Sequence, residues 1–281
     1  MGSSTKPRLD RILVSVDFAE PSLTAARWVA NHLAPQAEII LAHIIEPPPA
    51  TRTNVIRYPS VETIVNNVHV DASERLRQLC QSIAPDRARE EIRVGVPHEE
   101  LVGLAQTTGA DLIAVGRQDL ASSGWARIGV TAQRVLRKSP VPILLVTGAR
   151  EHPPASILVA VDESATTHAV IRWGAFMSHL FTAKAIVVHA AGTEESPDED
   201  AWIAEEIGKS SSGAVMEQRV TRSDARPAES IISEARALQS DLIVIGSSGA
   251  GAASQLLFGS VAESVLLSAP CPVLVVLPKD A

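Results

Sequence analysis

Residues 156–167 read SILVAVDESATT, and residues 11–22 read RILVSVDFAEPS. Each stretch is a short run rich in Ile, Leu and Val that ends on an aspartate, Asp162 in the later copy and Asp17 in the earlier one. Such runs, bounded by polar residues, are typical of strands buried on both faces of a sheet. Because a long-period repeat marks one structural unit built more than once, this pair predicts two domains of the same fold.

The similarity continues along both copies. The segments that align are the second strands EIILAHII and KAIVVHAA, the later strands ADLIAVG and SDLIVIG, and the closing strands SPVPILLV and APCPVLVV. The first copy carries about 16 residues more than the second. We assign most of them to the loop EPPPATRTNVIRYPS, residues 46–60, because Pro-rich surface loops tolerate extra length at little cost.

Short apolar strands alternate with helical segments in both copies. In the second copy we expect strands at Ile157–Val161, Ala185–His189, Val215–Val220, Asp241–Ile245 and Val273–Leu277, and helices at Thr166–Leu180, Asp198–Lys209, Pro227–Leu238 and Ser260–Ser268. This order is expected of parallel strands joined by right-handed crossovers. The sequence therefore predicts an α/β protein of two tandem, doubly wound, five-stranded parallel-sheet domains of Rossmann-like type, residues 1–150 and 151–281, related by a pseudo-two-fold axis.

Composition excludes several classes of protein. The chain of 281 residues is 46% hydrophobic and 3% aromatic, so its cores are built from aliphatic side chains. A net charge of −7 argues against binding to nucleic acid or to an anionic membrane, since both need clustered Lys and Arg. No apolar run approaches the roughly 20 residues of a membrane span. The two cysteines, Cys80 and Cys271, have no metal-ligand spacing, and we expect a cytoplasmic protein.

A glycine-rich stretch follows a buried strand of the second copy, GSSGAGAASQLLFGS at residues 246–260. Ligands of open parallel sheets bind beyond the carboxyl ends of strands, where the strand order reverses. Gly246 and Gly249 leave the backbone accessible there, and Gly259 with Ser260 opens a helix whose free N–H groups can hold a phosphate. The stretch has no lysine, as a Walker loop would, and no glycine fingerprint follows the first strand. We favour a phosphate-binding loop over a simple turn.

The spacing of Gly246, Gly249 and Gly259-Ser260 resembles the ATP-binding signature of the universal stress proteins, and the ending CPVLVV resembles the last strand of that family. In ATP-binding members, the aspartate after the first strand contacts adenine, a residue after the second strand packs on the nucleoside, and the glycines hold ribose and phosphates. The resemblance implies ATP as the ligand, alone or with Mg²⁺. The implied site consists of Asp162, Ala190, Gly246, Gly249, Gly259 and Ser260, with Ala160 and Ile245 as walls.

The resemblance also implies a cytoplasmic stress-response or signalling module and a mode of assembly. Members of the family pair their domains through the last strand. In this chain PILLV, residues 142–146, and PVLVV, residues 272–276, could form that pair internally. A homodimer of such tandem chains also stays open.

The first copy departs from the signature. Asp119 stands where the second glycine is expected, and Val130 stands where the serine is expected. A carboxylate repels a phosphate, and valine offers no hydroxyl. Arg117 and Arg127 are near enough in sequence to offset Asp119, and we expect Asp17 to cap the first helix. We predict that this copy keeps the fold and does not bind ATP in the manner of the family.

Other repeated residues are better explained by structure than by chemistry. His43 and His189 occur on equivalent strands of an intact and a degenerate copy, which favours a hydrogen-bonded structural role. Trp28 and Trp173 lie on amphipathic helices and are expected in the core. Cys271 precedes an apolar strand, where a buried, unreactive thiol is expected.

Two further functions stay open at this point. No nucleophile–base pair or acidic metal cluster accompanies the glycine stretch, so we expect a binding protein, with a slow ATPase as the alternative. The other alternative is an interaction protein that binds a ligand other than a nucleotide.

Overall fold

The computed structural model describes residues 7–33, 35–47, 61–117, 128–147, 150–193, 197–211, 213–248 and 258–278. The first half contains β1 (Arg11–Ser15), α1 (Glu20–His32), β2 (Glu38–Ile45), α2 (Val61–Ile83), β3 (Ala88–Val94), α3 (Pro97–Thr108), β4 (Leu112–Gly116), α4 (Val130–Lys138) and β5 (Ile143–Val146). The second half contains β6 (Ser156–Val161), α5 (Thr167–Phe181), β7 (Lys184–Ala191), α6 (Pro197–Ser210), β8 (Met216–Arg222), α7 (Pro227–Ala237), β9 (Leu242–Gly246), α8 (Ser260–Ser268) and β10 (Val273–Val276). The strands and helices predicted for the second copy match these bounds to within one or two residues at most ends.

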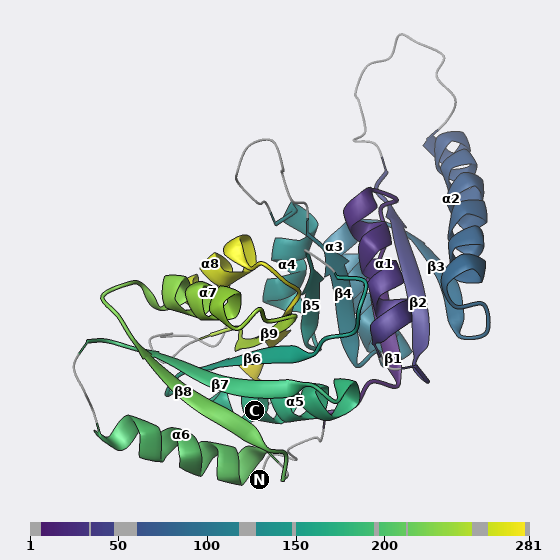
Figure 1. Ribbon diagram of the computed structural model, residues 1–281. Helices are drawn as coiled ribbons and strands as arrows, with labels where there is room; N and C mark the ends of the chain where they lie inside the picture. Colours follow the sequence, from purple (N-terminus) through teal and green to yellow (C-terminus); the bar gives the residue numbers. More distant parts are fainter. Residues whose placement is uncertain are drawn as a thin grey trace, which may run out of the picture.

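The strands form one sheet of ten, in the order β3-β2-β1-β4-β5-β10-β9-β6-β7-β8 (Figure 1). Pairing is parallel within each half, as predicted. Between the halves, β5 and β10 pair antiparallel, with Leu144 opposite Leu274. The α/β fold and the internal pairing of the last strands are therefore confirmed. The two sheets are continuous with each other, which the repeat alone did not specify.

This antiparallel junction sets the positions of the two halves' loops. The carboxyl ends of parallel strands all lie at one edge of their own half. Strands β5 and β10 run in opposite directions. The strands of the first half therefore have their carboxyl ends on one side of the ten-stranded sheet, along the strand direction, and the strands of the second half have theirs on the other side. Ligand sites of the two halves, if both existed, would face away from each other.

Helices cover both faces of the sheet. The apolar side chains of α1, α2, α5 and α6 pack together with one face, and those of α3, α4, α7 and α8 pack with the other. Trp28 and Trp173, on equivalent positions of α1 and α5, are 4% and 6% exposed, so their predicted place in the core is confirmed. Of the helices in the described part of the chain, none is long and apolar enough to span a membrane.

A repeated aspartate anchors the start of each half. The Asp111 carboxylate accepts backbone N–H bonds from Asp10 and Arg11 at 2.8 and 3.0 Å. The Asp241 carboxylate does the same for Ala155 and Ser156, at 2.9 and 3.1 Å. Asp111 precedes β4 and holds the backbone at the start of β1, and Asp241 precedes β9 and holds the backbone at the start of β6. The repetition of this aspartate is therefore explained by the fold.

The repeated histidines also serve the fold. The Nδ1 atoms of His43 and His189 lie 2.8 and 3.0 Å from the carbonyl oxygens of Val16 and Val161. Each bond ties the end of a second strand to the residue that ends or follows the first strand of the same half. The structural role predicted for both residues is confirmed.

The extra length of the first copy is divided between a loop and a helix. Helix α2 has 23 residues, whereas its counterpart α6 has 14. The connection from β2 to α2 spans residues 46–60, and its counterpart from β7 to α6 spans residues 192–196, so the loop takes a larger share of the extra length than α2 does, in agreement with the prediction. Residues 48–60 lie outside the described part of the chain.

Candidate functional site

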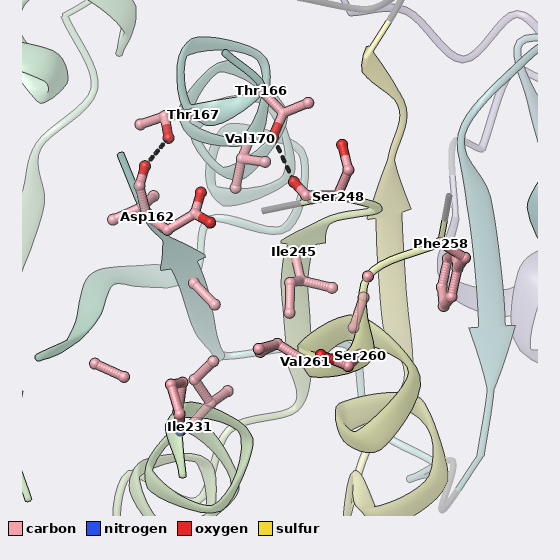
Figure 2. Close-up of a pocket in the computed structure, with 17 residues that line it drawn as sticks. Asp162, Thr166, Thr167, Val170, Ile231, Ile245, Ser248, Phe258, Ser260 and Val261 are labelled. Atoms are coloured by element: carbon pink, nitrogen blue, oxygen red, sulfur yellow. Dashed lines mark hydrogen bonds between the residues drawn. The ribbon is translucent and has the colours of Figure 1, made fainter. Parts of the chain in front are cut away.

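A pocket of about 510 Å³ opens at the carboxyl ends of β6 and β9, where the chain leaves these adjacent strands toward α5 and α8. This is the reversal point of the second half, since β6 connects outward to β7 and β9 connects inward to β10. Figure 2 shows Asp162 on one side of the pocket and Ser248 and Ser260 on the other. Its volume lies within the range of pockets that hold small ligands.

The pocket gathers nearly all the residues that the sequence assigned to a site. Lining residues from that prediction are Ala160, Asp162, Ala190, Ile245, Gly246, Gly259 and Ser260. Gly249, the remaining predicted residue, lies outside the described part of the chain. Residues that are up to 100 positions apart in sequence thus share one cavity.

The structure adds lining residues that the sequence did not indicate. They are Val161 at the end of β6, Thr166, Thr167 and Val170 near the start of α5, Pro227 and Ile231 on α7, and Ser248, Phe258, Val261 and Ala262 around the glycine stretch. The apolar periodicity of α7 places Ile231 toward the sheet, but it carries no information about which end of the sheet. Thr166 and Thr167 follow the Asp162 turn, and proximity to that aspartate was the one available signal.

Hydroxyl groups fix the turn between β6 and α5. Thr167 Oγ1 donates to the backbone oxygen of Asp162, and Thr166 Oγ1 donates to the backbone oxygen of Ser248 at 3.3 Å. The second bond joins the start of α5 to the glycine stretch. Thr166 is the N-cap residue of α5, so Asp162 does not cap this helix. The turn leaves Asp162 on the pocket wall.

Gly246 is required by this packing. A Cβ atom at Gly246 would lie 2.7 Å from Thr166 Oγ1. A side chain there would force the Thr166 hydroxyl to rotate and would disturb its bond to Ser248. The first glycine of the stretch therefore permits close approach of a helix and a strand at the pocket wall.

The amino end of α8 faces the pocket. Gly259 is its N-cap residue, and the three residues that follow, Ser260 to Ala262, line the pocket. The N–H of Gly259 donates to the backbone oxygen of Ser247 at 2.8 Å, which fixes the helix start against the end of β9. The first N–H groups of a helix have no partner within the helix, so this end can receive an anion.

These features suit a ligand with an apolar ring system and a phosphate. The walls are mainly aliphatic, a carboxylate lies on one side, and a helix amino end lies on the other. Of the described lining residues, none is Lys, Arg, His or Cys, so the pocket offers no nucleophile–base pair. Among the described residues, no three His, Cys, Asp or Glu side chains are grouped to hold a metal ion. The arrangement can bind and orient a ligand.

The equivalent region of the first half is arranged differently. Asp17 Oδ1 accepts the Ala19 N–H at 2.9 Å and the Ser22 hydroxyl at 2.6 Å. The N-cap residue of α1 is Ala19, so the prediction that Asp17 caps this helix is wrong. The Asp17 carboxylate instead holds the turn that enters α1.

The first turn of α1 also lies directly against the end of β4. A Cβ atom at Gly116 would lie 2.2 Å from the backbone oxygen of Pro21 and 2.7 Å from the nitrogen of Ser22. In the second half the nearest atom to the equivalent Cβ is a side-chain hydroxyl. At this position α1 packs through its backbone in the first half, whereas α5 packs through a side-chain hydroxyl in the second.

Arg117, which was considered as a cation able to offset Asp119, also reaches the other half of the chain. Its guanidinium is buried, and it donates to the backbone oxygens of Leu266 and Ala269 at 2.8 and 2.9 Å. Both acceptors belong to the carboxyl end of α8, in the other half of the chain. Asp119 and Arg127 lie outside the described residues.

Comparison with known proteins agrees with the fold and the repeat. A sequence profile described as the universal stress protein family matches residues 8–147 and again residues 155–276. A universal stress protein of Mycolicibacterium smegmatis is 28% identical over an alignment of 298 positions, gaps included, which covers 95% of this chain and 97% of the relative. A second relative, from Methanocaldococcus jannaschii, is 26% identical over 151 residues and covers 48% of this chain and 93% of its own length.

A solved structure extends the agreement to the whole fold. The crystal structure of a universal stress protein from Archaeoglobus fulgidus superimposes with a TM-score of 0.72 at 20% identity, covering 96% of this chain and 99% of that one. At this identity the likeness concerns the fold alone. Since the family profile matches both halves, the chain belongs to the universal stress protein family, with two tandem domains.

Proposed function

We propose that the second half binds an adenine nucleotide, with ATP as the reference ligand, and that the chain acts as a cytoplasmic stress-response or signalling module. The pocket between β6, β9 and α8 carries this proposal. It combines Asp162, an apolar cavity and an exposed helix amino end within one space of about 510 Å³. Each of these features matches one part of a nucleotide: the base, the ribose and the phosphate.

Different lining residues of the pocket would contact different parts of the nucleotide. Ala190 and Ile231 offer apolar surface for a base or ribose, and the Asp162 carboxylate can accept hydrogen bonds from amino or hydroxyl groups. The backbone at Ser260 and Val261 can donate to phosphate oxygens. Mg²⁺ bound with ATP would neutralise part of the triphosphate charge.

Arg117 supports a role in signalling within the chain. Helix α8 has its amino end in the pocket and its carboxyl end on a buried arginine of the first half. A ligand that moves or orders α8 therefore acts on a contact between the halves. The first half serves as the partner that receives this change.

Native mass spectrometry and calorimetry with MgATP test the proposal. We expect one nucleotide per chain. The variant Ser260→Asp places a carboxylate at the amino end of α8, which favours the helix and repels a phosphate, so nucleotide affinity should fall at least about tenfold while the fold is retained. The matched control is Val130→Asp, at the first position of the equivalent helix α4, and it should leave the affinity unchanged. Two nucleotides per chain, or equal loss in both variants, would contradict the assignment to the second half.

Phosphate release in the same samples separates a binding protein from a slow ATPase. With no Lys, Arg or His among the described lining residues, we expect release no faster than that of the Ser260→Asp variant. Release that depends on Ser260 would identify an ATPase.

A further inference from the structure

A second cavity lies between α5 and α6, which pack on the same face of the sheet (Figure 1). Its volume is about 470 Å³, and among the described lining residues it shares Thr167 alone with the candidate nucleotide pocket. Its lining includes three carboxylates, those of Glu163, Asp198 and Glu206, and the ring of Trp202. Carboxylates together with an aromatic face are the groups that bind an organic cation.

The wall that α6 contributes is a single row of side chains. Asp198, Trp202 and Glu206 are spaced four residues apart, so they lie on one face of the helix. The Glu206 side chain is 10% exposed, and its carboxylate lies 2.9 Å from Nδ1 of His168 on α5 and 3.5 Å from Nζ of Lys209. The exposed carboxylate of this row is that of Asp198, at the open end of the cavity wall.

The helix amino ends at the cavity do not cancel its negative charge. Glu163 precedes α5, and Asp198 lies in the first turn of α6. Each helix amino end acts as roughly half a positive charge, so two of them offset about one carboxylate. With three carboxylates in the lining, a cation in the cavity lowers the electrostatic energy and an anion raises it.

The first half of the chain provides an internal comparison for this cavity. Helices α2 and α6, aligned at their carboxyl ends, match Leu76 with Ile203, which are both 0% exposed. The same alignment matches Arg75 with Trp202. The positions that surround the cavity can therefore be compared one by one with those of the first half.

In the first half a guanidinium lies on an aromatic ring at this place. The Cζ atom of Arg75 lies 3.9 Å from the centroid of the Phe18 ring. Phe18 directly follows Asp17, as Glu163 follows Asp162, so Phe18 is the counterpart of a carboxylate that lines the cavity. The first half thus fills with its own cation–π pair the place that is a cavity in the second half.

The second half keeps the aromatic ring but takes it from a different element. Phe18, in the turn after β1, lies beside His43 with ring centroids 4.7 Å apart, and Trp202, on α6, lies beside the equivalent His189 at 5.6 Å. Because Trp202 stands at the position of the first-half arginine, the exchange removes the guanidinium and retains a ring. A ligand can supply the group that the exchange removed.

Two further positions change from apolar to polar. Leu23 and Leu79 pack against the apolar cluster on this face of the sheet in the first half. Their counterparts in the second half are His168 and Glu206, which form the polar pair described above. A buried ion pair seldom stabilises a fold more than apolar side chains in its place. Binding therefore explains these polar residues better than folding does.

We propose that the cavity between α5 and α6 binds a guanidinium group, carried by a small alkylguanidine or by an arginine side chain of a partner. The Trp202 face stacks on the planar cation, and the carboxylates of Glu163 and Asp198 accept its N–H groups. A guanidinium suits this set better than an ammonium group, because it is planar, presents five donors and is less strongly hydrated. The site is separate from the nucleotide pocket and does not depend on the proposed function.

Titration of the full chain with N-acetyl-arginine amide tests the proposal. The control ligand is N-acetyl-citrulline amide, which has nearly the same shape and no charge. The indole N–H signals are followed by ¹⁵N NMR, and the variant Trp202→Phe identifies the signal of Trp202. We expect a saturable shift of that signal with the arginine compound and at least about tenfold weaker binding of the citrulline compound. Equal binding of the two, or no saturable shift with the arginine compound, overturns the proposal.

Charge-removing variants locate the site. Glu163→Gln and Asp198→Asn should each weaken binding of the arginine compound about fivefold. The matched control is Glu99→Gln, an exposed carboxylate on α3 that should change the affinity less than twofold. An equal loss in all three variants would mean general attraction to an acidic chain, and the proposal would be wrong.

A double variant rebuilds the first-half arrangement in the second half. Glu163→Phe combined with Trp202→Arg places a ring and a guanidinium at the positions of Phe18 and Arg75. Binding, followed on the ligand signals, should fall at least about tenfold, while circular dichroism shows a folded chain. Unchanged affinity in the folded double variant contradicts the proposal. If this variant does not fold, the single-charge variants decide.

Butylguanidine separates the two sources of the guanidinium. Tighter binding of butylguanidine than of N-acetyl-arginine amide assigns the site to a free small molecule. Equal or tighter binding of the capped amide assigns it to an arginine of a partner protein. Both results support guanidinium recognition, and failure of both compounds to bind rejects it.

Discussion

In both halves of the molecule an aspartate follows the first strand, and the two halves use it differently. In the first half, Asp17 bonds to the turn that enters α1, and the backbone of that helix covers Gly116. In the second half, Asp162 lies on a pocket wall, and Thr166 meets Gly246 through a hydroxyl. The strands are equivalent, so the difference arises in the turns. Two copies of one fold can thus place the same residue type in different surroundings through a few turn residues, while the sheet is unchanged.

The largest difference between the halves is expected in the free energy of unfolding when Gly116 and Gly246 are changed to alanine. Gly116→Ala forces a Cβ against backbone atoms of α1, whereas Gly246→Ala meets a hydroxyl that can rotate. We expect losses in unfolding free energy of about 3 kcal/mol and about 1 kcal/mol, respectively. Urea unfolding followed by circular dichroism measures both.

Gly103→Ala is the matched control for both substitutions. This glycine lies within α3, and a Cβ there meets no atom within 4 Å. Removal of a helical glycine should stabilise the protein by roughly 0.5–1 kcal/mol. Equal destabilisation at Gly116 and Gly246 would show that the two helix entries are equally tight and would break the comparison.

The next effect concerns the residues that follow these glycines, Arg117 and Ser247. Arg117→Met removes two charged hydrogen bonds to the end of α8, and we expect a loss of about 2 kcal/mol in unfolding free energy. Ser247→Ala should cost less than about 1 kcal/mol. The exposed Arg137, changed to Met, controls for loss of charge. A loss at Arg117 no larger than that at Arg137 would mean that the contact between halves contributes little.

A smaller effect is expected at the two aspartates. Asp17→Asn weakens the bonds to Ala19 and Ser22, so stability should fall by about 1 kcal/mol, with nucleotide affinity unchanged. Asp162→Asn should reduce nucleotide affinity. Thermal unfolding gives the stability of the Asp17→Asn and Asp162→Asn variants, and calorimetry with MgATP gives the nucleotide affinity of each. Reduced affinity in the Asp17 variant would show that the first half contributes to binding.

The smallest effect concerns the two thiols, one in each half. Burial raises the pKa of Cys80 to about 11 and that of Cys271 to about 12. The native state thus holds the thiol protons more tightly than the unfolded chain. The stabilisation is fully present below the ordinary thiol pKa of about 8.5, and is lost as the pH rises toward 11 to 12.

Thiol labelling compares the halves directly. At pH 8 both cysteines should react far more slowly than in urea, and Cys80, 7% exposed, should react before Cys271, 1% exposed. The variants Cys80→Ser and Cys271→Ser each leave one thiol, so a colorimetric reagent reports each rate. Faster labelling of Cys271 would show that the core of the second half opens to solvent more readily than that of the first half.

Much of the fold was predictable because its signals are local. Runs of Ile, Leu and Val and the positions of Pro and Gly gave the strands and helices of the second half, and α8 was predicted at the residues where it occurs. Seven of the eight predicted site residues line one pocket, since they sit at strand ends or helix starts. Phe258 and Ile231 were not predicted, because a residue's place along a helix or loop does not reveal which cavity it borders.

The sequence by itself determined that the chain contains two copies of an α/β unit and that only one copy keeps the glycine spacing. These properties depend on short-range patterns. The tertiary structure alone decided that the ten strands form one sheet and that Arg117 reaches α8 across 149 residues of sequence. It also decided that Asp17 bonds to its own turn while Asp162 lines a pocket. Such contacts depend on how helices and turns pack against the sheet, and the sequence near each residue does not specify that packing.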